Sequence, residues 1–226
     1  KPVDIVRRPR TIAETIIEEF MLICNETVAE HYSRMNVPFV YRIHEQPDEG
    51  KMLHFREFVH NLNLSLKGNP EKTHPRVLQD LLQEVEGKPE ERVVNTLLLR
   101  AMKQAKYSPD RIPHYGLAAE YYTHFTSPIR RYPDLAIHRL MHEYRRGLPA
   151  QKRLSKIAKN NTIAAERSSL RERVAMEAER ESVDMKKVEF MADKVGREFD
   201  AVISGVTSFG LFAELDNLVE GLIHLS

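Results

Sequence analysis

The chain has 226 residues, of which 42% are hydrophobic and 30% charged, with a formal net charge of +1. This length and composition allow a sizeable core and predict a globular protein of one large or two unequal domains. The apolar runs are far shorter than the ~20 residues that cross a bilayer, and no signal-peptide pattern opens the chain, so we expect a cytoplasmic protein without a membrane segment. The single cysteine, Cys24, excludes a disulfide framework and is expected to be a small core residue.

The first predicted element is a helix over residues 11–34. Thr11 and Glu14 have the spacing of a capping box, and apolar residues then recur at helical spacing. We expect this helix to be mostly buried. A short strand closed by Pro47 follows, in which Arg42 and His44 should point together to one side.

Three further helices are predicted over residues 55–64, 75–86 and 90–104. The next stretch, residues 109–127, is rich in aromatic residues around Gly116, which indicates an extended segment that passes close to another part of the protein.

Ser127 and Pro128 place an N-cap residue before a proline, which predicts the start of a helix. Pro133 interrupts that pattern, so we expect a short turn, a bend, and then a helix to Arg146 that stops at Gly147.

A long helix with a thin apolar stripe is predicted over residues 160–195, ending at Gly196. The periodicity then changes to two, which predicts strands separated by turns. We therefore predict one domain over residues 1–195 and the beginning of a β domain over residues 196–226.

Positive charge is concentrated between Ser127 and Lys159, where nine Lys and Arg residues face only two acidic residues. This excess favours a polyanionic partner, although a solvated helix face would have the same composition. A helix that starts at Ser127 would present backbone N–H groups to a phosphate, and Arg130 would add a planar donor fork. Because Arg131 projects ~100° away, we expect one arginine to face a ligand and the other Asp134 or another carboxylate. The alternative is an arginine pair that only bridges helices.

The run "HYGLAAEYYTHFTSPIRRYPDLAIH", from His114 to His138, resembles the signature of the RNase II/RNase R family of processive 3′→5′ exoribonucleases. The segments "TIIEEFMLICN", "YRIHEQP" and "LLLRAMKQAKYSP" are similar to that family too. The stretch "RRYPDLAIH" looks more like the RNase R branch. From Phe199 onward the sequence resembles the opening of an S1-type OB-fold RNA-binding module.

The resemblance implies roles for individual residues. Arg130 would contact the phosphate near the scissile bond, and Glu179 in "EAERESVD" would be an active-site carboxylate, although an ordinary solvated helix face would have the same acidic neighbours. Met176 and Val183 flank Glu179, so it could lie close to the packed side. The residues expected at the RNA are Glu19 (favoured over Glu18), Arg131, Tyr132, Phe209, Phe212 and His224. One phenylalanine could instead belong to a barrel core.

The family hydrolyses phosphodiesters with Mg²⁺ held by closely spaced aspartates, and no such cluster occurs in this sequence. We therefore expect no metal ligands here and interpret the chain as the carboxyl-side part of an RNB catalytic domain. The fold class expected is α/β and helix-dominated, followed by the first strands of an OB-fold barrel.

Three functions follow. The first is part of a monomeric, Mg²⁺-dependent exoribonuclease that degrades single-stranded RNA to 5′-mononucleotides, the chain alone being inactive. The second is a non-catalytic RNA-binding module, and the third a helical scaffold with structural arginines.

Overall fold

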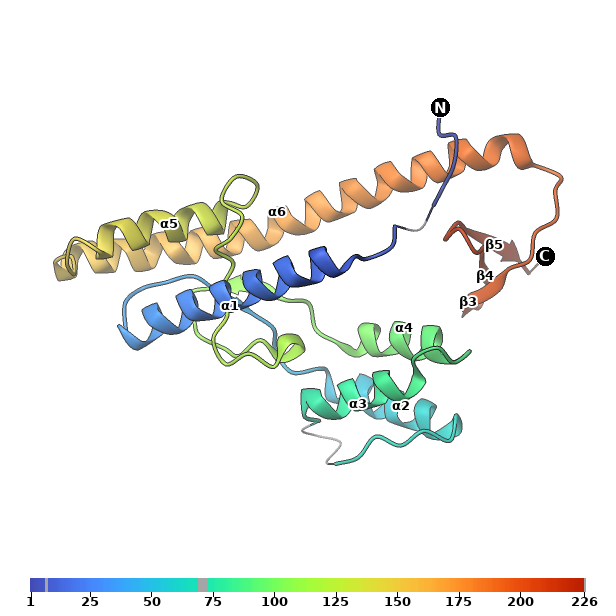
Figure 1. The fold of residues 1–226 in the computed structure, drawn as a ribbon, viewed down its shortest axis with the longest axis horizontal. Helices are drawn as coiled ribbons and strands as arrows, with labels where there is room; N and C mark the ends of the chain where they lie inside the picture. The colour runs from blue at the N-terminus through green and yellow to red at the C-terminus, as the bar shows by residue number, and fades with distance from the viewer. Residues whose placement is uncertain (7, 69–72, 226) are drawn as a thin grey trace. The chain divides into compact units, whose positions relative to one another are not determined.

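The computed structural model describes residues 1–6, 8–68 and 73–225 (Figure 1). The chain forms two compact units, one of residues 16–170 and the other of residues 1–15 together with 171–226. Helix α1 (Ile12–Arg34) and helix α6 (Gln151–Met191) each contribute residues to both units.

Helix α1 begins where its capping box predicts. The Thr11 N–H donates to Glu14 Oε2 at 2.9 Å, and the Glu14 N–H donates to Thr11 Oγ1 at 3.3 Å. The prediction that this helix is mostly buried was wrong, because only Asn25, Ala29 and Tyr32 are buried. Apolar residues occur on every side of α1, so their spacing does not select one packed face.

Cys24 is exposed, so its prediction as a core residue was also wrong. It follows Ile23, whose side chain is 58% exposed, on the side of α1 that faces away from the packed residues. Packing of α1 comes instead from its C-terminal half, through Ala29 and Tyr32.

The first core cluster of the larger unit surrounds a pair of short strands. Strand β1 (Tyr41–Ile43) pairs antiparallel with β2 (Lys106–Ser108), and Arg42 lies opposite Tyr107. Tyr41 and Ile43 are buried while Arg42 is only partly buried, which confirms the predicted alternation. The cluster also takes residues from α1, from α5 (Tyr132–Tyr144) and from the first half of α6: Ala29, Tyr32, Ile137, Leu140, Tyr144, Ile157 and Ala165.

A second core cluster joins three helices, α2 (Glu49–Asn61), α3 (Pro75–Val85) and α4 (Glu91–Ala101). Helix α2 begins before the predicted range because the Asp48 side chain accepts a hydrogen bond from the Lys51 N–H and caps it. Proline occupies the start of α3, as predicted.

The segment between β2 and α5 is largely irregular, with one short 3₁₀ helix, η2 (Tyr115–Leu117). Its close approach to another part of the protein is confirmed at Gly116. The Gly116 N–H donates to His44 Nδ1 at 3.0 Å, and a Cβ at Gly116 would lie 2.7 Å from that nitrogen. A side chain at this position would collide with the imidazole.

Helix α5 begins at Tyr132, so the prediction of a helix start at Ser127 and Pro128 was wrong. Residues 128–130 form a turn instead. Pro133, which has no N–H to donate, fits the first turn of α5. The predicted order of a short turn followed by a helix is therefore confirmed, although the helix ends at Tyr144 and not at Arg146, and Gly147 follows with φ of 110°.

Helix α6 begins at Gln151, earlier than the predicted residue 160. Its first half packs along α5, where Arg153 donates to both carboxylate oxygens of Glu143 at 2.7 Å. Ile157 and Ala165 bury this half of α6 in the first core cluster.

The smaller unit contains the second half of α6 and a three-stranded antiparallel sheet. Met176 and Val183 are 56% and 49% exposed, so the expectation that they mark a packed side near Glu179 was wrong. After η3 (Ala192–Lys194) come β3 (Val202–Thr207), β4 (Gly210–Glu214) and β5 (Glu220–His224), in the order β3-β4-β5. The described strands form a small open sheet, and the division of the chain into domains at residue 196 stays a prediction.

Candidate functional site

The candidate site is built around the turn that precedes α5. The N–H groups of Arg130 and Arg131 both donate to the Ser127 carbonyl, at 3.3 and 3.0 Å. Arg130 is exposed, whereas Arg131 has a side chain only 14% exposed. The two neighbouring arginines therefore face different surroundings, although the helical geometry from which this was expected does not apply, because neither residue lies in a helix.

Arg131 pairs with the fully buried carboxylate of Asp134. Its Nε and Nη2 donate to Asp134 Oδ1 at 3.1 and 2.7 Å, and the Ser127 N–H donates to the same oxygen at 2.8 Å. The structure thus assigns the carboxylate contact to Arg131 and leaves the Arg130 guanidinium at the surface. Arg131 was predicted to contact RNA, and its pairing with Asp134 makes it a support of the turn as well.

A partly buried histidine, His124, lies next to these arginines. Burial is the main cause that lowers the pKa of His124 from 6.5 to about 2, and the positive charges of Arg131, Arg42 and Arg130 contribute to the same shift. A hydrogen bond of 2.8 Å links His124 Nδ1 to the Tyr107 hydroxyl. The imidazole is therefore neutral near pH 7, and the arginines around it gather positive charge at one place.

Arg42 reaches this place from β1. Its guanidinium lies 4.6 Å from the centroid of the Tyr107 ring, a cation–π contact. The Arg42 N–H donates to the Tyr122 carbonyl at 2.9 Å, which fixes the strand against the segment that leads to the turn. Sequence reasoning placed Arg42 on one side of a strand but did not connect it with Arg130.

Asn25 anchors the same segment from helix α1. Fully buried, it donates through Nδ2 to the Tyr122 hydroxyl at 3.1 Å and accepts from the Phe125 N–H at 3.0 Å. His114 packs edge-on to Tyr122, with ring centroids 5.2 Å apart. Burial, with smaller effects of His44 and Arg42, lowers the pKa of His114 to about 4.

The hydrogen bonds of these residues hold the segment that carries the exposed Arg130 guanidinium, a group suited to binding an anion such as a phosphate. His114, Tyr122 and His124 were missed as site residues, because a single histidine or tyrosine in a sequence does not show what surrounds it. The sequence feature that could have identified them is their position in the same segment as Arg130, from His114 to His138.

The other predicted residues of the larger unit are Glu19 and Tyr132. Glu19 is exposed on α1, while Glu18 is partly buried. Tyr132 is 56% exposed at the first position of α5, next to the turn. Arg130 and Tyr132 are therefore exposed on either side of the largely covered Arg131, and Glu19 faces solvent.

The remaining predicted residues belong to the smaller unit. Glu179 is exposed on α6. The rings of Phe209 and Phe212 meet edge to face, with centroids 6.2 Å apart. Because Gly210 pairs with His224 and Phe212 with Leu222, Phe212 and His224 share one face of the sheet. Phe209, in the turn between β3 and β4, is 48% exposed.

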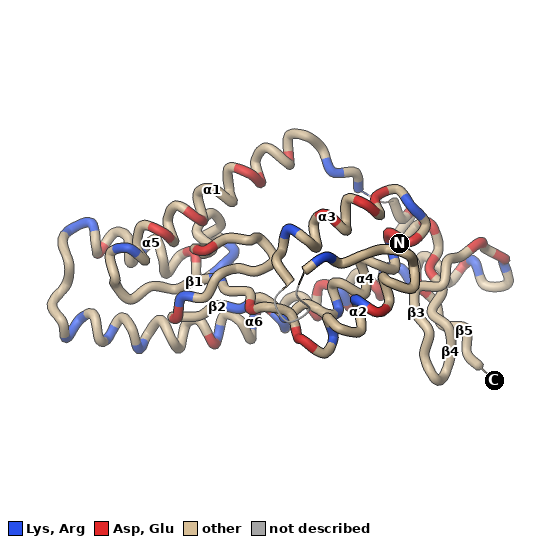
Figure 2. The backbone as a smooth tube through the Cα atoms, turned by 90° about the horizontal axis from the view of Figure 1, so that it is seen from below, with Lys and Arg blue, Asp and Glu red and all other residues tan. Residues whose placement is uncertain are grey.

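Positive charge also gathers where α5 ends and α6 begins, as the blue segments of Figure 2 show. The residues responsible are Arg139, Arg145, Arg146, Lys152, Arg153, Lys156 and Lys159. Their concentration agrees with the sequence, and Arg153 is paired with Glu143.

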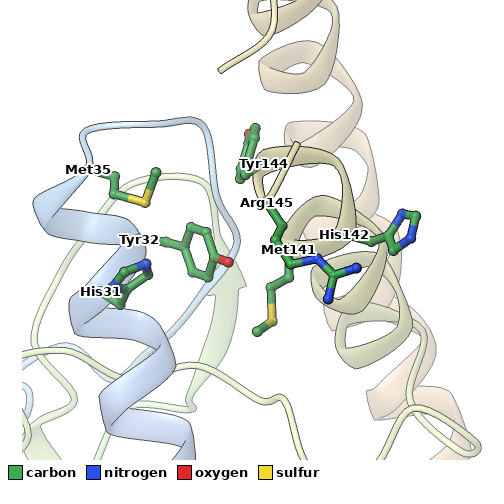
Figure 3. Close-up of a pocket in the computed structure, with 7 residues that line it drawn as sticks. All are labelled: His31, Tyr32, Met35, Met141, His142, Tyr144 and Arg145. Atoms are coloured by element: carbon green, nitrogen blue, oxygen red, sulfur yellow. The ribbon is translucent and has the colours of Figure 1, made fainter. Parts of the chain in front are cut away.

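A cavity of about 370 Å³ lies between α1 and the C-terminal end of α5 (Figure 3). Tyr32, Met35 and Met141 supply an apolar floor, with His142 and Arg145 among the other lining residues. Its lining comes from the opposite end of α5 to the turn that carries Arg130, so the cavity is separate from the candidate site.

Among residues 1–6, 8–68 and 73–225, no group of three or more His, Cys, Asp or Glu side chains is arranged to hold a metal ion. Within the same residues, none of the helices has the length and apolar character needed to cross a bilayer. Within the described part of the chain, the donor set therefore does not fit a resident metal.

Comparison with known proteins identifies the class. The sequence profile of the RNB domain matches residues 1–147, and the chain belongs to the RNB-domain family. It is 48% identical over 225 residues to "Ribonuclease R 1" of Lactococcus lactis, covering 100% of this chain and 28% of that protein. "Ribonuclease R" of Thermotoga maritima is 45% identical, with 99% of this chain and 32% of that protein covered.

Solved structures agree. Mycoplasma genitalium RNase R in complex with ribose-methylated single-stranded RNA superposes with a TM-score of 0.90 at 32% identity, covering 96% of this chain and 34% of that one. Yeast Ssd1, a pseudonuclease, shares the fold with a TM-score of 0.78 at 24% identity, over 98% of this chain and 28% of its own. The chain thus spans about a third of the length of the relatives it matches.

Proposed function

We propose that this chain is part of a 3′→5′ exoribonuclease of the RNase R type, which hydrolyses single-stranded RNA to 5′-mononucleotides in the cytoplasm as a monomer. The observation that carries the proposal is the exposed Arg130 guanidinium, presented on a clamped turn beside Arg42 and Arg131. Support also comes from the family membership and from relatives named Ribonuclease R that cover the whole chain. A related RNase R has been solved in complex with single-stranded RNA.

Arg130 in this proposal donates to the oxygens of the phosphate at which the chain is cut. The guanidinium can donate two parallel hydrogen bonds to two oxygens of one phosphate. The negative charge that develops on these oxygens in the transition state strengthens both hydrogen bonds. The surrounding positive charge of Arg42 and Arg131 favours the same phosphate before it reacts.

The other predicted residues hold the strand. Glu19 accepts from ribose hydroxyls of the terminal nucleotide, and Glu179 is a carboxylate near that nucleotide. Tyr132 offers a ring next to the turn, and Phe209 and Phe212 stack on bases in an S1-type RNA-binding module, with His224 on the same face. Stacking requires no particular base, which fits a nuclease that removes nucleotides of every kind.

Mg²⁺, when bound, would activate the attacking water and stabilise the leaving oxygen. The described residues offer no fitting ligand set, so we propose that its ligands lie in parts of the protein outside this chain, and that the chain alone does not cleave RNA. The relatives are about three times as long as this chain, which leaves room for such ligands.

The second candidate function is RNA binding without cleavage. It is favoured by the missing ligand set among the described residues and by the same fold in yeast Ssd1, a pseudonuclease. Incubating the full-length protein with a labelled single-stranded oligoribonucleotide, with and without Mg²⁺, separates the two candidates. Release of mononucleotides only with Mg²⁺ supports the nuclease, and binding without release supports the binding module.

The role of Arg130 is tested by Arg130→Ala in the full-length protein. One contact among many phosphates contributes little to affinity, but it faces the developing charge, so kcat should fall by about a hundredfold while Kd for RNA changes by less than about fivefold. Arg139→Ala is the matched control, because Arg139 is exposed on α5 within the same basic stretch. Equal turnover in Arg130→Ala and the unaltered protein would refute the assignment.

A further inference from the structure

The turn that presents Arg130 lies outside any helix or strand, so its shape depends on a side chain. Asp134, in the first turn of α5, is fully buried, and the hydrogen bonds of its side chain converge on Oδ1. That oxygen accepts from the Ser127 N–H at 2.8 Å and from Nε and Nη2 of Arg131 at 3.1 and 2.7 Å. One carboxylate oxygen therefore ties residue 127 to residue 131.

Arg130 lies between the two residues that are tied. Its own backbone N–H reaches the Ser127 carbonyl at 3.3 Å, a long hydrogen bond that also competes with Arg131 for the same acceptor. The Asp134 carboxylate thus adds to the backbone hydrogen bond of 3.0 Å from the Arg131 N–H to the Ser127 carbonyl, and together they restrain the path of the chain through Arg130. The direction in which the exposed guanidinium points follows from that path.

The arrangement is not the most stable one for a buried position. Asp134 Oδ2 is buried and has no hydrogen-bond partner among the residues that the structure describes, which costs free energy because the oxygen has lost its water. Burying an arginine–carboxylate pair also gains little over apolar packing. Asp134 therefore lowers the stability of the folded protein while it fixes the position of a neighbouring cation. This combination is typical of a residue that supports a functional site.

We propose that Asp134 is a positioning residue for RNA hydrolysis, which acts by holding Arg130 at the scissile phosphate. Asp134 is buried and touches no substrate, so it works only through the turn. The inference rests on the proposed function, because it assigns a support to the residue that the proposal places at the reacting phosphate.

The test uses Asp134→Asn in the full-length protein, with a short single-stranded oligoribonucleotide at saturating and limiting concentrations. The amide keeps the size of the side chain but removes the charge that holds Arg131. A displaced Arg130 guanidinium stabilises the transition state less well, and it affects the binding of the substrate much less. We therefore expect kcat to fall by about ten- to a hundredfold while KM changes by less than about threefold.

A double-mutant cycle separates positioning from general destabilisation. When Arg130 is already alanine, Asp134→Asn should lower kcat by less than about twofold further, because the residue it positions is gone. The control is Glu143→Gln, which disrupts another arginine–carboxylate pair on α5, with Arg153, away from the turn. It should leave kcat unchanged in both backgrounds, with Tm recorded for every variant.

If Asp134→Asn does not fold, Arg131→Lys replaces it, because lysine keeps the charge opposite Asp134 but loses the forked contact. We expect Arg131→Lys to lower kcat by the same factor as Asp134→Asn. In the Arg130→Ala background, it should lower kcat no further. The inference would be overturned if the double variants lost kcat by the product of the two single losses. It would also be overturned if neither Asp134→Asn nor Arg131→Lys lowered kcat. No effect of Arg130→Ala itself would instead refute the proposed function.

Discussion

Acid should destabilise this protein well above the pH at which its carboxylates are protonated, because two histidines are held neutral inside it. His114 and His124 have pKa values lowered to about 4 and about 2, in both cases mainly by burial. An unfolded chain returns both imidazoles to about 6.5. Below pH 6.5 the unfolded state therefore binds more protons than the folded state, and stability falls with falling pH.

The magnitude follows from these values. Each histidine removes about 1.4 kcal/mol of unfolding free energy for every pH unit below 6.5, until its folded pKa is reached. At pH 5.0 each has removed about 2 kcal/mol, and the two together about 4 kcal/mol. A small domain has only about 5–15 kcal/mol in total, so the loss is large.

The assay is urea unfolding at pH 7.5 and pH 5.0, followed by circular dichroism. His124→Asn keeps an acceptor for the Tyr107 hydroxyl but cannot be protonated, so it should halve the difference between the two pH values. His60→Asn on α2 is the control, because His60 is exposed. A pH difference that stays the same in His124→Asn would refute the reasoning that this imidazole is buried and neutral.

Three further changes give separate tests. Asn25→Ala leaves the Phe125 N–H and the Tyr122 hydroxyl without their partner, so the unfolding free energy should fall by about 2–5 kcal/mol; a loss below about 1 kcal/mol would contradict the buried network. Ile137→Val removes one fully buried methylene group and should cost about 1 kcal/mol in the same measurement, and no loss would mean that the core is loosely packed there. In the full-length protein, Phe209→Ala should weaken RNA binding by about 5- to 150-fold in fluorescence anisotropy while short substrates are still cleaved, whereas a dead enzyme would refute a stacking role.

The sequence by itself determined features that depend on neighbours along the chain. The Thr11 and Glu14 capping box set the start of α1, and the alternation of buried and partly buried residues identified β1. Sequence reasoning also expected Arg130 and Arg131 to face different partners, and Arg131 does meet Asp134 three positions away, although the helix assumed in that reasoning includes neither arginine. Such rules act over a few residues, and the sequence displays them directly.

Only the tertiary structure decided which surfaces are covered and which distant residues meet. The apolar residues of α1 gave no sign that Cys24 and its neighbours would be exposed, because burial depends on what packs against a helix. Likewise, Arg42 and Arg130 come together around His124 although they are far apart in sequence. Hydrogen bonds such as that between Asn25 and Tyr122 bring these segments together, and no local pattern predicts which partner each side chain will find.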